Sequence, residues 1–174
     1  MTPSTGPSAG AGVPGEGRPR CVFCEILAGR APASFVLRDE ECSAFLDLHP
    51  AAPGHLLVVP NVHAARLSDL SPGAAARALE VAAALLAAER ALGLAAAAGL
   101  LLLHDGTAAH QHVPHVPVHV VPRHRGDSLR VIGTFATRAA GLSGRPGRRE
   151  ELDALAARIR TSIPAVRVEP GLRS

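Results

Sequence analysis

Several residue types that often serve recognition are missing from this chain of 174 residues. Tyrosine, tryptophan and lysine do not occur, phenylalanine occurs four times, and all 18 basic residues are arginine. Aromatic rings that stack on bases are therefore scarce, and the net charge is only +3. The composition does not predict a nucleic-acid-binding surface, but it is compatible with a small anionic ligand.

Long apolar segments are also missing. Residues 1–19 lack the apolar core of a secretory signal, and the apolar stretch 81–103 is interrupted by Glu89, Arg90 and Gly93. Only three cysteines occur, which is too few for a disulfide framework and favours a reducing compartment. We therefore expect a cytoplasmic protein without membrane contact.

The chain divides into one folded domain with additions at both ends. Residues 1–19 are rich in Gly, Pro, Ser and Thr and predict a disordered tail. The folded domain is expected at 20–126, followed by an irregular linker at 127–146. Residues 147–174 are expected to form a helix and tail, because apolar residues recur at helical spacing from 148 to 163.

The folded domain is expected to be α+β. Apolar and alternating runs predict strands at 34–39, 42–47, 56–60, 99–103 and 115–121. A helix is expected at 72–92, because Ser71 and Pro72 suit its start and Gly93 suits its end. Alanine and leucine surround much of this helix, so we expect a sheet on one side and a dimer partner on another. The prediction is an antiparallel sheet of about five strands with this long helix and the C-terminal helix.

Histidine is concentrated in one short part of the chain. Six of the nine histidines lie between His104 and His124. Residues 115–121 alternate, so a strand here would place three valines on one face and would place His115, Pro117 and His119 on the other. From the residues alone, a half-buried edge strand with solvated histidines remains an alternative.

This histidine-rich run resembles the signature of the histidine triad (HIT) superfamily, His-φ-His-φ-His-φ-φ with φ apolar. The matching residues are Gln111-x-Val113-x-His115-Val116-x-Val118-His119-Val120-Val121-Pro122-Arg123. A second stretch is similar to the first half of the HIT domain: Phe45-x-Asp47-x-x-Pro50-x-x-Pro53-Gly54-His55, then an apolar run and Pro60-x-x-His63. The resemblance covers roughly residues 21–126 and implies a HIT-like domain at 20–126, a homodimer and a nucleotide-like substrate.

The resemblance also implies roles for individual positions. In the family, the middle histidine attacks the α-phosphate of a nucleotide, but this chain has Pro117 there. Asp47 holds the position that binds ribose hydroxyls, and His119 is the last histidine of the motif. His104, His110 and His112 replace the family's Asn, Gly and Ser near ribose and phosphate, whereas Gln111 is retained. The apolar slot for the base corresponds to Val22, Phe23, Ile26, Leu46 and Leu48.

The pair Cys21-x-x-Cys24 has three interpretations from the residues alone: a redox dithiol, half of a zinc site, or two buried thiols. Zinc-bearing members of the superfamily place ligands at the positions of Cys21, Cys24, His63 and His115. The resemblance thus implies a structural zinc, because four protein ligands leave no open position. Cys42 lies in an apolar run and is expected to be a core thiol.

Two functional hypotheses follow. In the first, the protein binds a nucleotide but has lost the covalent step, since proline offers no nucleophilic nitrogen. In the second, it is an active nucleotide phosphohydrolase or phosphoramidase that uses water or one of His110, His112 and His119. An isolated change at Pro117 is disfavoured, because positions 104, 110 and 112 also depart from the family pattern.

Overall fold

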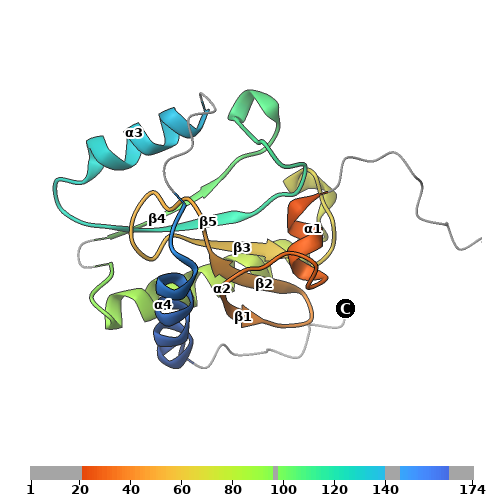
Figure 1. Cartoon of the computed structure of the whole chain (residues 1–174). Helices are drawn as coiled ribbons and strands as arrows, with labels where there is room; N and C mark the ends of the chain where they lie inside the picture. Colours follow the sequence, from red (N-terminus) through yellow and green to blue (C-terminus); the bar gives the residue numbers. More distant parts are fainter. Residues whose placement is uncertain (1–20, 96–97, 140–145, 165–174) are drawn as a thin grey trace, which may run out of the picture.

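The computed structural model describes residues 21–95, 98–139 and 146–164 (Figure 1). The tail predicted at 1–19 lies outside the described residues, as do residues 165–174 of the predicted C-terminal tail. None of the helices in the described part of the chain is long and apolar enough to cross a membrane.

One antiparallel sheet of five strands organises the molecule, which confirms the α+β prediction. Its strands are β1 (Phe35–Arg38), β2 (Cys42–Leu46), β3 (Leu56–Pro60), β4 (Ala98–Leu103) and β5 (Val118–Arg123). Their order across the sheet is β1-β2-β3-β5-β4. The last strand in the sequence therefore lies between β3 and β4 rather than at an edge.

Helices cover both faces of this sheet (Figure 1). They are α1 (Val22–Leu27), α2 (Pro72–Ala91), α3 (Ser128–Ala139) and α4 (Arg149–Ser162), with short 3-10 turns at Leu67–Asp69 and Thr107–Ala109. The main core joins α2 and α4 to one face through Val58, Val120, Leu85 and Ile159. The other face carries α1 in one apolar cluster and α3 in another. Because both faces are covered, β2 and β3 are buried along their whole length.

The helix α2 begins and ends as its sequence predicts. Ser71 precedes it, and its hydroxyl accepts a hydrogen bond from the Ala74 N–H at 3.2 Å. Gly93 follows the last turn with φ of +73°, a conformation that glycine adopts without steric cost. The second apolar side of α2 packs on α4 of the same chain. Part of the cover that the sequence assigned to a dimer partner is therefore supplied within one protomer.

The histidine-rich strand begins later than predicted. We expected it at 115–121, but β5 starts at Val118, and His115 lies in the preceding loop. Two prolines, Pro114 and Pro117, cannot donate backbone hydrogen bonds and delay regular pairing. The His115 N–H instead bonds to the carbonyl of Val113 at 2.8 Å, and the Val116 N–H bonds to that of Ala64 at 2.8 Å.

The prediction of an irregular linker at 127–146 was wrong for most of its length, because α3 occupies Ser128–Ala139. A turn before the helix positions it. Arg123 donates two hydrogen bonds to Asp127, at 2.9 and 2.7 Å, and these lower the pKa of Asp127 to about 2. The helix is amphipathic, with Val131 and Phe135 in one apolar cluster against the sheet, although it contains Gly133, which disfavours a helix.

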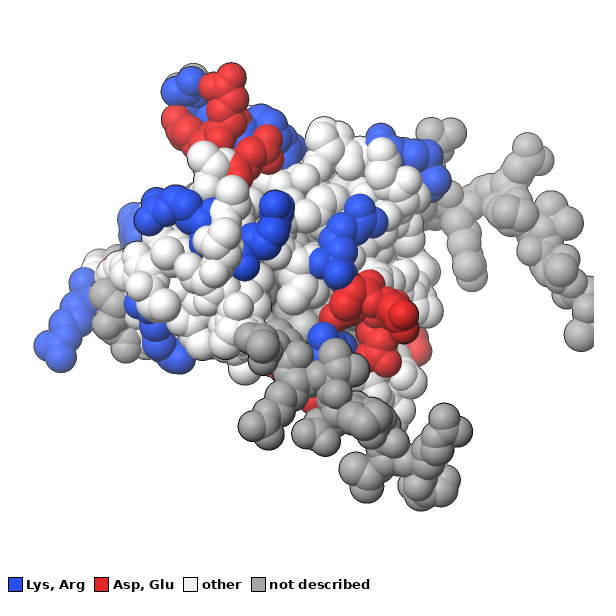
Figure 2. All heavy atoms as spheres, turned by 90° about the horizontal axis from the view of Figure 1, so that it is seen from below, with Lys and Arg blue, Asp and Glu red and all other residues white. Residues whose placement is uncertain are grey.

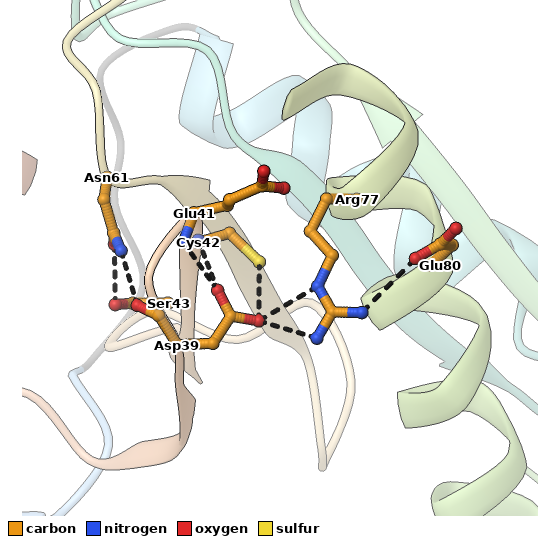
Figure 3. Close-up of polar contacts among 7 residues, drawn as sticks. All are labelled: Asp39, Glu41, Cys42, Ser43, Asn61, Arg77 and Glu80. Carbon is orange, nitrogen blue, oxygen red and sulfur yellow. Dashed lines mark hydrogen bonds and ion pairs between the residues drawn. The ribbon is translucent and has the colours of Figure 1, made fainter. Parts of the chain in front are cut away.

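A polar network connects α2 to the turn between β1 and β2 (Figure 3). The Asp39 carboxylate accepts the N–H groups of Glu41 and Cys42 and two hydrogen bonds from Arg77 of α2, at 3.1 and 2.9 Å. Partial burial acts to raise the pKa of Asp39, but these donors outweigh it, so its pKa lies below the ordinary value. Asn61 extends the network by donating to the Asp39 carbonyl at 2.7 Å. The network fixes the β1–β2 turn against α2.

Arginines are spread over the surface rather than gathered in one place. On the face shown in Figure 2 they form several separate groups, with acidic side chains between some of them. Arg30 pairs with Glu25, and Arg148 pairs with Glu151. This face therefore carries no continuous basic patch.

Glu89 is an exception to the pattern of paired charges. Its side chain is fully buried in α2, and neither carboxyl oxygen has a hydrogen-bond partner among the described residues. Burial raises the pKa of this carboxyl to about 8, although Arg90 acts in the opposite direction. The folded state thus holds the proton to higher pH than the unfolded state, so stability declines as pH rises from about 4.5 to about 8.

We therefore expect Glu89→Gln to raise the melting temperature at pH 8 and to leave it nearly unchanged at pH 4. The gain in the free energy of unfolding is limited to a few kcal/mol, since one pKa unit corresponds to about 1.4 kcal/mol. Thermal unfolding of wild type and variant across this pH range measures the effect. The exposed Glu40→Gln is the control, and an equal shift at both pH values would contradict the assignment.

Candidate functional site

A small pocket lies at the end of the sheet where β5 begins. Its volume is about 100 Å³, and its walls come from loops and elements that are far apart in the sequence. The lining residues are Phe23, His104, His110, Gln111, His112, Val113, His115, Pro117, His119 and Phe135. We call this the histidine pocket. Imidazoles dominate its polar surface, and none of the described residues that line it carries a carboxylate.

A hydrogen-bonded chain from the Ala51 N–H through His55 positions His119. The Nε2 atom of His55 lies 3.0 Å from Nδ1 of His119, and Nδ1 of His55 lies 3.6 Å from a carboxylate oxygen of Asp47. The Ala51 N–H donates to His55 Nδ1 at 3.1 Å. Neutral His55 must therefore carry its proton on Nε2 and donate it to His119 Nδ1. This leaves the remaining proton of neutral His119 on Nε2.

Asp47, His55 and His119 are also close enough together to suggest a metal site, since their ligand atoms lie within 4.8 Å of one another. The hydrogen bonds argue against it. With His55 Nδ1 accepting the Ala51 N–H, a metal on Nε2 would require an imidazolate. The group is better described as a chain that holds one tautomer of His119.

Asp47 itself does not line the histidine pocket. One of its oxygens accepts the His49 N–H at 2.9 Å, and its side chain lines a neighbouring cavity of about 360 Å³ between the β2–β3 loop, α3 and α4. The structure thus places Asp47 beside His55, with 3.6 Å between the nearest carboxylate oxygen and Nδ1, which is longer than a hydrogen bond. Ribose binding by Asp47 stays a prediction.

His104 has a fixed tautomer as well. Its Nδ1 atom contacts the carbonyl oxygen of Ala109, and a carbonyl can only accept a hydrogen bond. The proton of neutral His104 is therefore on Nδ1, and Nε2 carries a lone pair. The ring lies 5.3 Å from that of His119, in a T-shaped arrangement.

Gln111 supports the loop that carries His104. Its side-chain oxygen accepts the Gly106 N–H at 2.8 Å, and its side-chain nitrogen donates to the Ala65 carbonyl at 2.8 Å. Both ends of the amide are thus bonded to backbone. The residue was predicted to bind substrate, and the structure gives it contacts that hold two loops together.

His110 and His112 lie at the mouth of the pocket, and both are exposed. His110 adopts φ of +60° and is the one non-glycine residue with positive φ in the described part of the chain. The left-handed conformation explains why the family places glycine here, and it costs roughly 1 kcal/mol or more for another residue.

The predicted apolar slot is only partly assembled. Phe23 lines the pocket and packs with Ile26 and Phe45 in the cluster beneath α1. Leu46 was predicted to share this slot, but it belongs to the core on the opposite face of the sheet. Successive residues of a strand point to opposite faces, so Phe45 takes the place assigned to Leu46.

The remaining two slot positions, Val22 and Leu48, are exposed and do not line the histidine pocket. Leu48 instead uses its backbone, where its carbonyl accepts the Gly147 N–H at 2.7 Å. The structure therefore supports Phe23 and Ile26 as neighbours of the pocket, and it separates the other predicted slot residues from it.

Two residues of the site were not predicted from the sequence. His55 was read only as part of the Pro-Gly-His motif, although its place directly before an apolar strand could have marked it. Phe135 of α3 lies outside the recognised domain, and no pattern pointed to it. Its ring lies 6.0 Å from His55 and 6.2 Å from both His104 and His119.

A second group of side chains could hold a metal ion. Cys21, Cys24, His63 and His115 place one ligand atom each within 4.8 Å of the others. Nδ1 of His115 lies 3.5 Å from Cys21 Sγ and 3.7 Å from Cys24 Sγ, and His63 Nδ1 lies 3.2 Å from Cys24 Sγ. These separations suit neighbouring ligands around one tetrahedral ion, whose bonds are about 2.0–2.3 Å.

Protonation also suits metal binding by this group. The other nitrogen of His115, Nε2, donates to the Pro60 carbonyl at 2.9 Å, so Nδ1 has a free lone pair. Burial lowers the pKa of His115, which keeps the imidazole neutral. Burial also raises the pKa of the Cys24 thiol to about 11, with Cys21 adding to the effect. A bound cation would reverse that shift by stabilising the thiolate.

The fold and the pocket together define an α+β protein in which histidines from three segments meet on one face of an antiparallel sheet. Residues 28–126 match the HIT domain, which is more than half of the chain. The protein therefore belongs to the HIT domain family.

Relatives agree with this assignment. An uncharacterized HIT-like protein of Mycobacterium tuberculosis is 42% identical over 111 residues, which cover 64% of this chain and 76% of that protein. The adenosine 5'-monophosphoramidase of Saccharomyces cerevisiae is 32% identical over 117 residues, which cover 65% and 68%. A zinc-bound histidine triad family protein from Mycobacterium smegmatis has a similar structure, with a TM-score of 0.67 and 34% identity over 82% of this chain and 92% of that one.

The hydrogen bonds make a specific prediction about tautomers. At a pH where the imidazoles are neutral, we expect His104 to carry its proton on Nδ1, which is the less common form in solution, and His119 to carry it on Nε2. Long-range 1H–15N correlation spectra distinguish the two forms. The exposed His124 serves as the reference, and a proton on Nε2 of His104 would contradict the assigned network.

Proposed function

We propose that this protein is a HIT-fold nucleotide-binding protein that does not form a nucleotidyl-histidine intermediate. The observation that carries the proposal is Pro117, which is buried and lines the histidine pocket at the position of the family's nucleophile. The nitrogen of a proline within a peptide chain cannot attack phosphorus.

The residues around Pro117 support the proposal that the pocket still binds a nucleotide. His119 has a defined N–H donor, and the hydrogen-bonded chain through His55 holds it in place. The pocket adjoins the apolar cluster of Phe23, Ile26 and Phe45, which suits a base. The yeast relative carries the name adenosine 5'-monophosphoramidase, an activity on an adenosine nucleotide. We infer a nucleoside monophosphate or a derivative of it as ligand.

The distance to the phosphorus atom limits which histidine could replace the missing nucleophile. Attack requires the reacting atoms to be about 3–3.5 Å apart. His119 is two residues beyond Pro117, so its backbone is displaced by roughly 6.6 Å along the strand. An active hydrolase that uses His119, His110 or His112 is the second candidate function, and the exposed, left-handed His110 is the feature that favours it.

We also propose that Cys21, Cys24, His63 and His115 bind a structural zinc ion. The support is the mutual distances of their ligand atoms, the bond from His115 Nε2 to Pro60, and the zinc-bound relative. Zinc would tie α1 to the loop that precedes β5. It would also keep His115 out of any catalytic role.

A homodimer in the cytoplasm completes the proposal. The edge strand β4 leaves one side of its backbone unpaired within the described sheet, and Leu101 on it is partly exposed. Leu79 of α2 is also exposed. A partner that covers this edge would bury both side chains.

Nucleotide binding is tested by titration calorimetry with adenosine 5'-monophosphate. We expect binding in the micromolar to millimolar range, and we expect Pro117→His to gain a covalent nucleotide adduct on incubation with an adenosine 5'-phosphoramidate. Wild type should show no adduct by mass spectrometry. Absence of both heat and thermal shift at millimolar nucleotide would sink the binding proposal.

Zinc is tested by metal analysis of purified protein. We expect about one zinc per chain in wild type, and we expect Cys24→Ser to lose most of it and to melt at a lower temperature, because metal binding contributes directly to folding. Cys42→Ala is the matched control, since this thiol lies beside Asp39 and away from the cluster. Equal zinc content in wild type and Cys24→Ser would refute the ligand assignment.

A further inference from the structure

The end of β4 lies opposite the start of β5. Their register pairs Leu102 with His119 and Leu103 with Val118, so one step further His104 comes opposite Pro117. Residues directly opposite in an antiparallel pair share a face, with Cβ atoms about 4.5–5.5 Å apart. The chain thus lacks an imidazole at 117 and carries one across from it, where the family's pattern has Asn.

The His104 ring is prepared to accept a proton. Its Nδ1–H is held by the Ala109 carbonyl, so the lone pair is on Nε2, and the residue lines the histidine pocket. The loop that carries it is fixed by both ends of the Gln111 side chain. Among the described residues, no carboxylate lines the pocket that could act as a general base in place of His104.

The distance from His104 to the position of the family's nucleophile decides whether this imidazole attacks phosphorus directly or acts through a water molecule. Moving the imidazole across one strand spacing displaces it by about 5 Å from the position of the family's nucleophile. Direct attack tolerates much less displacement, whereas a general base works well through one water molecule. The pocket, at about 100 Å³, has room for a water beside a phosphoryl group, because a water needs only about 10–15 Å³ by this measure.

We propose that His104 is a general base that activates water for direct hydrolysis of a nucleotide anhydride at its α-phosphate. The proposal rests on nucleotide binding in the histidine pocket. The water gives a proton to His104 Nε2, its oxygen forms the new bond to phosphorus, and the bond from phosphorus to the leaving group breaks. The leaving group departs with the electron pair as an anion, and the proton on His104 then passes to solvent.

His119 determines which leaving groups this reaction serves. Its Nε2–H is the single proton of a neutral ring whose Nδ1 accepts from His55, so it donates a hydrogen bond to a phosphoryl oxygen but does not release the proton. A leaving group that departs as a stable anion, such as a phosphate, needs no proton. An amine does, so phosphoramidates are expected to be poor substrates.

The test uses the full chain with diadenosine tetraphosphate, which attack at the α-phosphate converts to adenosine 5'-monophosphate and ATP. We expect turnover by wild type without a covalent adduct after acid quench, and inversion at phosphorus with a chiral phosphorothioate analogue. His104→Asn should lower kcat by about 100-fold or more, with a much smaller change in the affinity for adenosine 5'-monophosphate. The exposed His124→Asn is the control.

A second variant tests whether His104 takes part in the reaction or only stabilises the structure. His104→Ala should regain part of its activity when free imidazole is added, and a purely structural role would give no such rescue. An adduct on any histidine, retention at phosphorus, or His104→Asn as active as wild type would overturn the proposal. Absence of turnover in a protein that binds adenosine 5'-monophosphate would overturn it too and leave the proposed binding function standing, whereas absence of binding would end both.

Discussion

The position of β5 between β3 and β4 is the constraint on which the site depends. Backbone pairing on both sides brings the residue before β3, the residue after β4 and a residue within β5 to the same face of the sheet, next to β5. These are His55, His104 and His119, which are separated by up to 64 positions in the sequence. A change in the register of either pair by one residue would turn His119 to the other face.

Hydrogen bonds then give each imidazole a different role. The Ala51 N–H and His55 fix His119 as a donor, the Ala109 carbonyl fixes His104 as an acceptor, and the Pro60 carbonyl leaves His115 with a lone pair toward the cysteines. Similar side chains therefore differ in chemistry because their backbone partners differ. Pro117 removes one imidazole from this set, and the other assignments are independent of it.

The segments outside the HIT domain also belong to the functional unit. α4 covers α2, so the core of the domain is closed by residues beyond 126. α3 places Phe135 against three histidines, and the turn held by Arg123 and Asp127 positions that helix. The pocket is consequently lined in part by a residue beyond the matched HIT domain.

The sequence by itself determined the strands, the helix at 72–92, the C-terminal helix and the HIT resemblance, because periodicity, capping residues and motif spacing are local properties. The group of Cys21, Cys24, His63 and His115 followed from that resemblance. Tertiary structure decided what depends on distant partners. It moved the start of the last strand past Pro117, replaced Leu46 by Phe45 beside Phe23, turned the expected linker into α3, and paired His55 with His119. Side-chain direction and tautomer follow from strand pairing and hydrogen bonds, and neither is encoded in the order of residues along one segment.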